Sequence, residues 1–241
     1  MISMRRIGVA LLVAGLPGLS FGAGTNLVEQ VAEGGAAVVV TLGLSILFLA
    51  VTIERSLHLR ARAVLPLDLI ERVQPLWAAH RFDELGKLLA DDDSTLARVI
   101  ACMVEHRHQP YAIVSRLAGD LASMELRQHQ QKAYALAIVA TVAPIVGLLG
   151  TVLGMVDAFH VIAYADGMGN PALLAGGISK ALVNTAAGLT VALPALGMHH
   201  YFKHRLATLG LALEKQINAL INLQFLPQPE VPGLRVVQHA H

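Results

Sequence analysis

Three stretches of this sequence are long, apolar and free of charged side chains. They cover residues 34–53, 133–156 and 181–202, with 20, 24 and 22 residues. A helix needs about 20 apolar residues to cross the hydrocarbon core of a bilayer. A water-soluble fold of 241 residues cannot easily bury three such helices. The pattern predicts an all-α membrane protein with three transmembrane helices, over residues 34–53, 133–165 and 172–202.

The few charges of the chain gather in one region. Only 15% of the residues are charged, against about a quarter in soluble domains, and 11 of the 18 Lys and Arg and 11 of the 17 Asp and Glu lie within residues 54–132. Apolar positions recur there at helical spacing, and the acidic run 91–93 before Ser94 is typical of a helix start. Residues 54–132 are therefore predicted to form a helical module outside the bilayer.

Lys and Arg flank the expected spans on one side only. They follow the first span, precede the second and follow the third, whereas the turn at 166–171 holds none. The positive-inside rule then places residues 54–132 in the cytoplasm together with a helical extension at 203–226 and a disordered tail at 227–241. The turn at 166–171 and the N-terminal segment 24–33 are expected to be periplasmic.

The first 23 residues read as a secretory signal peptide. Arg5 and Arg6 precede an apolar run, which a proline breaks before small residues at 20–24. Cleavage after Gly22 or Ala23 agrees with the orientation given by the charges. The alternative is an uncleaved first span, although the apolar run is shorter than a bilayer requires.

Several classes of function have little support in the sequence. A net charge of +1 provides no basic field for nucleic acid, and Cys102 is the single cysteine, which excludes a cysteine-based metal cage. No nucleotide-binding or hydrolase motif is present. We expect no enzymatic activity, no cofactor and no metal. His200 and His204 have the spacing of a metal pair, but an interfacial belt with Tyr201 is the simpler interpretation.

Small residues form a stripe on each of the last two spans. At 100° per residue, spacings of three and four place them on one helix face, where another backbone can come close. The glycines expected to serve helix packing are Gly147, Gly150, Gly154, Gly177 and Gly188. Each span also holds a threonine, Thr151 or Thr185, and an ionisable residue, Asp157 or Lys180. Charge inside a membrane is costly and often marks an ion route or an ion pair.

The segments APIVGLLGTVLGMVDAF (143–159) and GGISKALVNTAAGLTVALPA (176–195) resemble the paired signature of the ExbB/TolQ/MotA proton-channel family. The resemblance covers about residues 34–226. MotA-like proteins have four spans and only three are expected here, which favours the ExbB and TolQ branch, and the signal-bearing periplasmic N-terminal extension favours ExbB. It implies a multi-pass subunit of the bacterial inner membrane, with a periplasmic N-terminus. It also implies a homo-oligomeric ring, a pentamer in the family, surrounded by lipid, around a single-span ExbD- or TolR-like partner, which drives a TonB- or TolA-like protein.

The resemblance carries over residue by residue within the two motifs. Thr151 and Thr185 match the pore threonines of the family, and Pro144 and Pro194 match its motif prolines. Lys180 departs from the pattern, since ExbB and TolQ commonly have glutamate there. An ion pathway is expected through Thr151, Thr185, Lys180 and Asp157. If Asp157 and Lys180 form an ion pair, the proton would be carried by an aspartate on the partner's helix; otherwise Asp157 is the carboxylate of this chain that could carry it.

Asp157 and Lys180 are equally far from the expected turn, so they should lie at about the same depth. One hypothesis is that they form an ion pair, which removes the cost of each isolated charge. The other is that Lys180 snorkels to the headgroups. The functional prediction is a proton-channel subunit that energises TonB-dependent transport. The alternatives are a TolQ-like subunit for envelope maintenance and a non-conducting membrane scaffold.

Overall fold

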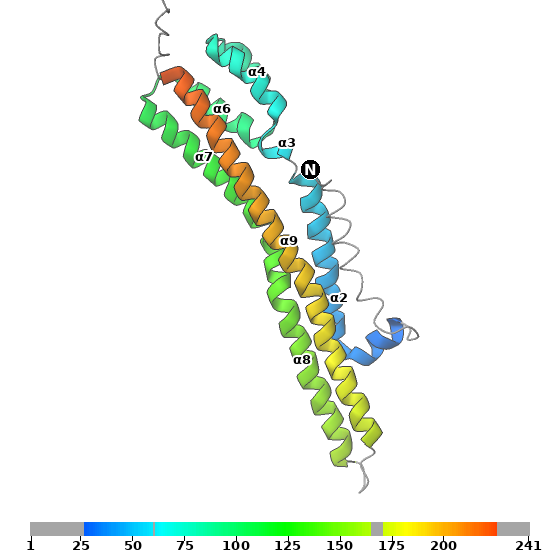
Figure 1. Ribbon diagram of the computed structural model, residues 1–241. Coiled ribbons are helices and arrows are strands. Elements are labelled where there is room, and N and C mark those ends of the chain that lie inside the picture. Colours follow the sequence, from blue (N-terminus) through cyan, green and yellow to red (C-terminus); the bar gives the residue numbers. More distant parts are fainter. Residues whose placement is uncertain (1–26, 60, 165–170, 226–241) are drawn as a thin grey trace, which may run out of the picture. The chain divides into compact units, whose positions relative to one another are not determined.

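The computed structural model describes residues 27–59, 61–164 and 171–225, and the described chain is helical (Figure 1). The expected signal peptide (1–23), the turn at 166–171 apart from Pro171, and the tail at 227–241 lie outside these residues. Three described helical stretches each contain an apolar window long enough to cross a membrane: Gly35–His58, Tyr111–His160 and Leu174–Leu223. The all-α class and the three long apolar helices are thereby confirmed.

The chain divides into two compact units. Of the described residues, the first unit contains 27–59, 126–164 and 171–207, and the second contains 61–125 and 208–225. The elements of the first unit are α2 (Leu27–His58), the end of α7 (Tyr111–Lys132), α8 (Tyr134–Tyr164) and most of α9 (Pro171–Phe225). Helix α9 runs without interruption for 55 residues, so the expected third span and its extension are one helix.

Helix α2 is bent at Gly35. This residue has φ 64 and ψ −160, a conformation that side chains with a Cβ rarely adopt, inside an otherwise helical segment. The first turns of α2 therefore leave the line of the rest of the helix (Figure 1). Beyond the bend, α2 packs against α8, and Thr41 donates a hydrogen bond back to the carbonyl of Ala37 at 2.9 Å.

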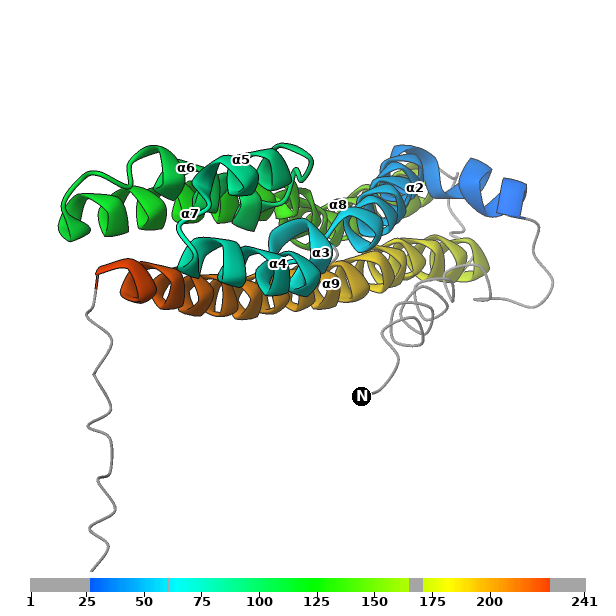
Figure 2. The same ribbon diagram turned by 90° about the horizontal axis from the view of Figure 1, so that it is seen from above.

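The core of the first unit lies between α2, α8 and α9 (Figure 2). Side chains from all three helices are buried there: Phe48, Leu59, Ala133, Leu136, Val139, Ala195, Met198, Phe202 and Leu206. The outer faces of the same helices carry exposed Leu, Ile and Val, such as Ile46, Leu148 and Leu193. Apolar side chains on the outside as well as the inside are typical of helices surrounded by lipid.

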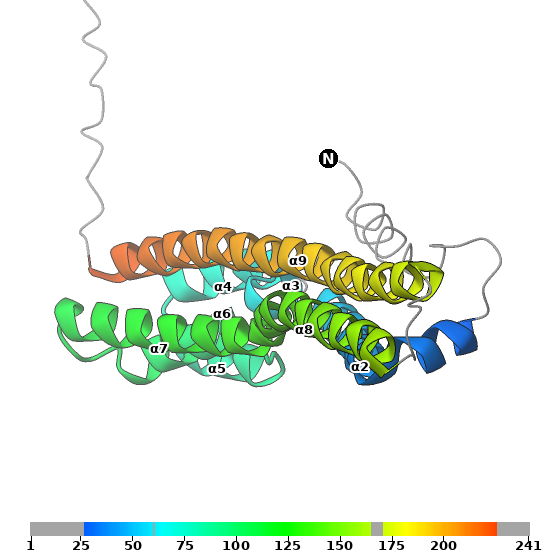
Figure 3. The same ribbon diagram turned by 90° about the horizontal axis from the view of Figure 1, so that it is seen from below.

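The second unit has the core of a water-soluble helical domain. Its elements are α3 (Ala61–Val64), α4 (Leu67–Ala78), α5 (Phe82–Ala90), α6 (Thr95–Glu105), most of α7 and the end of α9 (Figure 3). Its fully buried side chains include Val73, Trp77, Leu85, Leu96, Ile100, Met103, Val114 and Leu213. Their large volumes fill the space between the helices.

Polar contacts fix the ends and the packing of these short helices. Ser94 caps α6, since its hydroxyl accepts a hydrogen bond from the amide of Ala97 at 3.2 Å, as the acidic run before it indicated. Arg98 on α6 forms an ion pair at 3.0 Å with Glu125 on α7, whose side chain is only 9% exposed. Trp77 meets Phe82 edge to face, with the ring centres 5.7 Å apart. The placement of this unit in the cytoplasm stays a prediction.

Candidate functional site

Helices α8 and α9 come into backbone contact through their glycines. A Cβ on Gly188 would lie 2.6 Å from the carbonyl oxygen of Ala143 and 3.1 Å from the Cα of Gly147. A Cβ on Gly147 would lie 2.9 Å from the carbonyl oxygen of Asn184. No real Cβ contact is that short, so the two helices can approach this closely only because both positions are glycine.

The other glycines of the two stripes also face a neighbouring helix. A Cβ on Gly154 would lie 3.1 Å from the Cβ of Ala181, and one on Gly177 would lie 2.5 Å from the Cβ of Ala158. A Cβ added to Gly176, next to Gly177 in sequence, would have no heavy atom within 4 Å. The close approach of α8 and α9 therefore extends over the whole length from Gly147 to Ala158.

Thr151 and Thr185 meet in the middle of this contact. Their hydroxyls are hydrogen-bonded to each other. The hydroxyl oxygen of Thr151 also lies 3.0 Å from the carbonyl oxygen of Ala181 on α9, and that of Thr185 lies 3.2 Å from the carbonyl oxygen of Gly147 on α8. Each hydroxyl has one hydrogen, so while one threonine donates to the other, only the accepting threonine donates to a carbonyl of the opposite helix. Both residues are half-buried in the single chain.

A third helix joins the site at Gly150. A Cβ there would lie 2.7 Å from the Cβ of Ala37 on α2 and 2.9 Å from the Cβ of Asn184 on α9. Asn184 is 6% exposed, which makes it a buried polar residue one position before Thr185. The sequence analysis did not include Asn184 among the site residues. The signal that could have found it is an amide side chain next to Thr185 on a face of small residues.

Asp157 and Lys180 lie beside this contact, and both side chains are exposed. Asp157 precedes the buried Ala158, and Lys180 precedes the buried Ala181, so each is displaced by about 100° from a residue of the contact. The ion pairs of the described residues do not join these two side chains. Whether they pair in an assembled complex stays a prediction.

Pro144 and Pro194 lie inside α8 and α9. Proline has no amide hydrogen, so each one leaves a carbonyl in the preceding turn without its helical donor. The carbonyls concerned belong to Ala140 and Thr190. The hydroxyls of Thr141 and Thr190 donate to other carbonyls, those of Ala137 at 3.0 Å and Ala186 at 2.8 Å.

Comparison with known proteins gives matches over this region. The model of the MotA/TolQ/ExbB proton channel family matches residues 90–215, which include the whole α8–α9 contact. The biopolymer transport protein exbB1 of Vibrio cholerae is 32% identical over 113 residues, 47% of this chain and 50% of the relative. The match therefore spans only half the length of that protein.

Two relatives from Synechocystis match over more of their length. The putative biopolymer transport protein ExbB-like 3 is 29% identical over 202 residues, 82% of this chain and 95% of the relative. The putative biopolymer transport protein ExbB-like 1 is 30% identical over 180 residues, 71% of this chain and 68% of the relative. A family match to more than half of the sequence, with a contact of paired helices at its centre, leads to one conclusion: this chain belongs to the MotA/TolQ/ExbB proton channel family.

Proposed function

We propose that this chain is the ring-forming subunit of an inner-membrane proton channel that works with a single-span ExbD-like partner to energise a TonB-like protein. The observation that supports this most is the hydroxyl pair of Thr151 and Thr185, half-buried between α8 and α9 within the region that matches the family. Several copies arranged with these hydroxyls towards a common axis would line a passage with groups that both donate and accept hydrogen bonds.

Threonine does not titrate, so the proton needs another carrier. Within the two expected spans of the hairpin, Asp157 is the acidic residue and Lys180 the only Lys or Arg. Both are exposed in the single chain, and a charge in the hydrocarbon region is costly, so the assembled complex must supply each with a counter-ion or with water. In our proposal the carrier is a carboxylate on the partner's helix, and the threonine hydroxyls order water beside it.

A hydroxyl-deletion experiment tests the channel proposal. Thr151→Val and Thr185→Val keep the branched shape of the side chain but remove the hydroxyl. We expect the purified complex to keep its size while proton flux into liposomes falls by about tenfold, the change that loss of a hydrogen bond worth about 1.4 kcal/mol gives. Thr151→Ser and Thr185→Ser retain the hydroxyl and serve as matched controls that should keep most of the flux.

The same experiment separates the channel from the alternative of a non-conducting scaffold. A scaffold requires only helix packing, so it predicts that the valine variants assemble and function like the wild type. If flux is absent in the wild-type complex as well, the channel proposal is wrong. A TolQ-like role is distinguished by the partner: co-purification with a single-span protein encoded beside a TolA-like rather than a TonB-like protein would favour it.

The role of Asp157 is tested separately. Asp157→Asn removes the carboxylate with little change in volume, at an exposed position where the fold does not depend on it. We expect proton flux to survive in this variant, because the proposed carrier belongs to the partner. Loss of flux in an intact complex would instead make Asp157 an obligatory carrier. Exchange of the two charges, with Asp157→Lys and Lys180→Asp together, tests whether they pair: recovery of a defect of the single variants supports the pair.

A further inference from the structure

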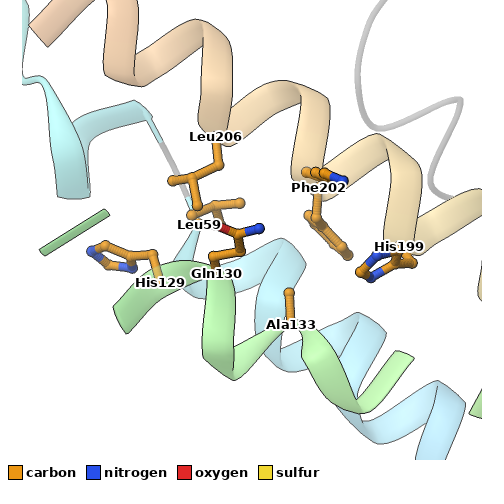
Figure 4. A pocket seen from close by; sticks show the side chains of 8 residues that line it. Leu59, His129, Gln130, Ala133, His199, Phe202 and Leu206 are labelled. Carbon is orange, nitrogen blue, oxygen red and sulfur yellow. The ribbon is translucent and has the colours of Figure 1, made fainter. Parts of the chain in front are cut away.

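A small recess lies at the end of the first unit where α2 leaves its candidate span. Its walls come from three segments: the end of α2, the junction of α7 and α8, and α9 (Figure 4). It is lined by Leu59, His129, Gln130, Ala133, His199, Phe202, Lys203 and Leu206. Leu59 directly follows His58, the last residue of the candidate span Gly35–His58. The orientation predicted from the positive charges puts this end of the first unit near the lipid headgroups.

The chain around this recess is strongly cationic. Residues 54–59, 126–133 and 199–206 together contain five Lys or Arg residues, five histidines and one carboxylate, Glu54. Glu54 is already in an ion pair with Arg55. Lys203 stands exposed at the rim of the recess. Lys and Arg beside the end of a membrane span attract anionic lipids, because lipid phosphates lie at the membrane surface.

Two buried nitrogens at this end have no hydrogen-bond partner. They are Nδ1 of His199, which is a lining residue of the recess, and Nε of Arg205, six residues further along α9. A buried polar atom without a partner costs about 1 to 3 kcal/mol relative to a bonded one. Arg205 does not line the recess, so the unpartnered nitrogen that bears on it is Nδ1 of His199, which can donate to an acceptor such as a phosphate oxygen when it carries the hydrogen.

We propose that this recess and its rim form a binding site for an anionic phospholipid, with the headgroup phosphate held by Lys203 and His199. The volume open to water inside it, about 10 Å³, matches one water molecule, so the phosphate sits over the recess with one oxygen or one water inside. The side chains of Leu59, Ala133 and Phe202 form an apolar floor beneath it. The proposal requires only that the chain spans a membrane and is independent of proton conduction.

The test measures lipid binding to the purified full-length protein. Native mass spectrometry in mild detergent counts bound lipids during titration with phosphatidylglycerol or with the zwitterionic phosphatidylcholine. We expect the wild type to bind phosphatidylglycerol in preference, and Lys203→Gln to weaken this binding by about fivefold, the size expected for one basic residue near a lipid surface. Lys203→Arg keeps the charge and should restore the binding.

Controls separate a site from general surface charge. Lys215→Gln removes one charge from an exposed position on α9 in the second unit and should bind phosphatidylglycerol like the wild type. His199→Phe removes the unpartnered nitrogen and fills the recess, and should weaken binding as Lys203→Gln does. Thermal unfolding of every variant confirms that it is folded.

Three results would overturn the proposal. The first is equal affinity of Lys203→Gln and Lys215→Gln for phosphatidylglycerol. The second is equal affinity of the wild type for phosphatidylcholine. The third is displacement of the lipid by an excess of inorganic phosphate, which would identify a site for a free anion instead.

Discussion

Helices pack against each other in opposite ways in two regions of the molecule: the contact between α8 and α9, and the core of the second unit. In the first, glycines remove side chains until backbone meets backbone, and hydroxyls bond to carbonyls of the opposite helix. In the second, large side chains such as Trp77, Leu96 and Met103 fill the space between helices. In lipid the hydrophobic effect does not favour contact between helices, so van der Waals contact and hydrogen bonds must stabilise it. In water the burial of apolar area itself stabilises the packing.

The largest expected effect comes from adding one methyl group to the glycine contact. Gly188→Ala places a Cβ 2.6 Å from the carbonyl oxygen of Ala143, where only backbone could yield. We expect a loss of about 2 kcal/mol or more in helix association, within the range for overpacking, and weaker assembly in detergent. Gly197→Ala is the matched control on the same helix, because no atom lies within 4 Å of its Cβ position.

The control variant should be neutral or more stable than the wild type, since alanine favours a helix by about 0.5 to 1 kcal/mol over glycine. Thermal unfolding and size-exclusion chromatography of the full chain measure both. If Gly188→Ala and Gly197→Ala have the same unfolding temperature and the same elution volume, α8 and α9 are not in backbone contact at Gly188.

A cavity in the second unit should lower the free energy of unfolding by a comparable amount, through the loss of packing contacts. Leu96→Ala deletes a side chain that is 0% exposed, which should destabilise the unit by about 2 to 5 kcal/mol. Leu67→Ala removes the same atoms from a side chain that is 67% exposed and should have little effect. Pulse proteolysis in urea reports the difference. A small effect at Leu96 would mean that this core is not tightly packed.

The ion pair of Arg98 and Glu125 should respond unequally to loss of its two partners. Arg98→Met leaves the carboxylate of Glu125 buried without its cation, whereas Glu125→Gln leaves an arginine that is half exposed and can be hydrated. We expect Arg98→Met to cost about 2 to 3 kcal/mol, towards the cost of a buried unpaired charge, and Glu125→Gln about 1 kcal/mol. Equal costs would show that burial of Glu125 does not matter. Urea unfolding of the full chain measures both.

The smallest effect concerns the reactivity of the single cysteine. Burial, with a smaller contribution from the charge of Glu105, raises the pKa of the Cys102 thiol. The thiolate fraction at a given pH is therefore smaller than in a free cysteine, and alkylation should be slower with its pH midpoint shifted upward. Glu105→Gln should lower this midpoint slightly. A midpoint at or below that of a free cysteine would contradict the assignment. Iodoacetamide labelling across a pH series measures it.

The long helices were predictable because an uncharged segment needs a minimum length to cross a bilayer. Residues 34–53 and 133–156 reach that length, and no knowledge of tertiary contacts is needed to see it. The glycine spacing likewise indicated which faces would carry a contact. The cap at Ser94 was predictable because caps depend on neighbours in sequence. These features share one property: the residues that decide them lie within a few turns of each other.

Contacts between distant segments were not predictable. The approach of Ala37 to Gly150 joins residues 113 positions apart, and nothing in the sequence pairs the first span with one particular face of the second. The bend at Gly35 was equally hidden, because a glycine within an apolar helix is compatible with a straight course. The recess at Leu59 and His199 required all three segments to be in place.

The crossed hydrogen bonds of Thr151 and Thr185 have a mechanical consequence. The two hydroxyls join α8 to α9 through their bond to each other and a bond to a carbonyl of the opposite helix, so sliding of one helix along the other would break these bonds and bring the glycine positions against side chains. We therefore expect one stable axial alignment of α8 against α9, with the intermediate alignments higher in free energy. Any motion of this protein during its function is thus expected to move α8 and α9 together as one rigid body. Relative movement is then expected only at the surfaces that they present to other chains.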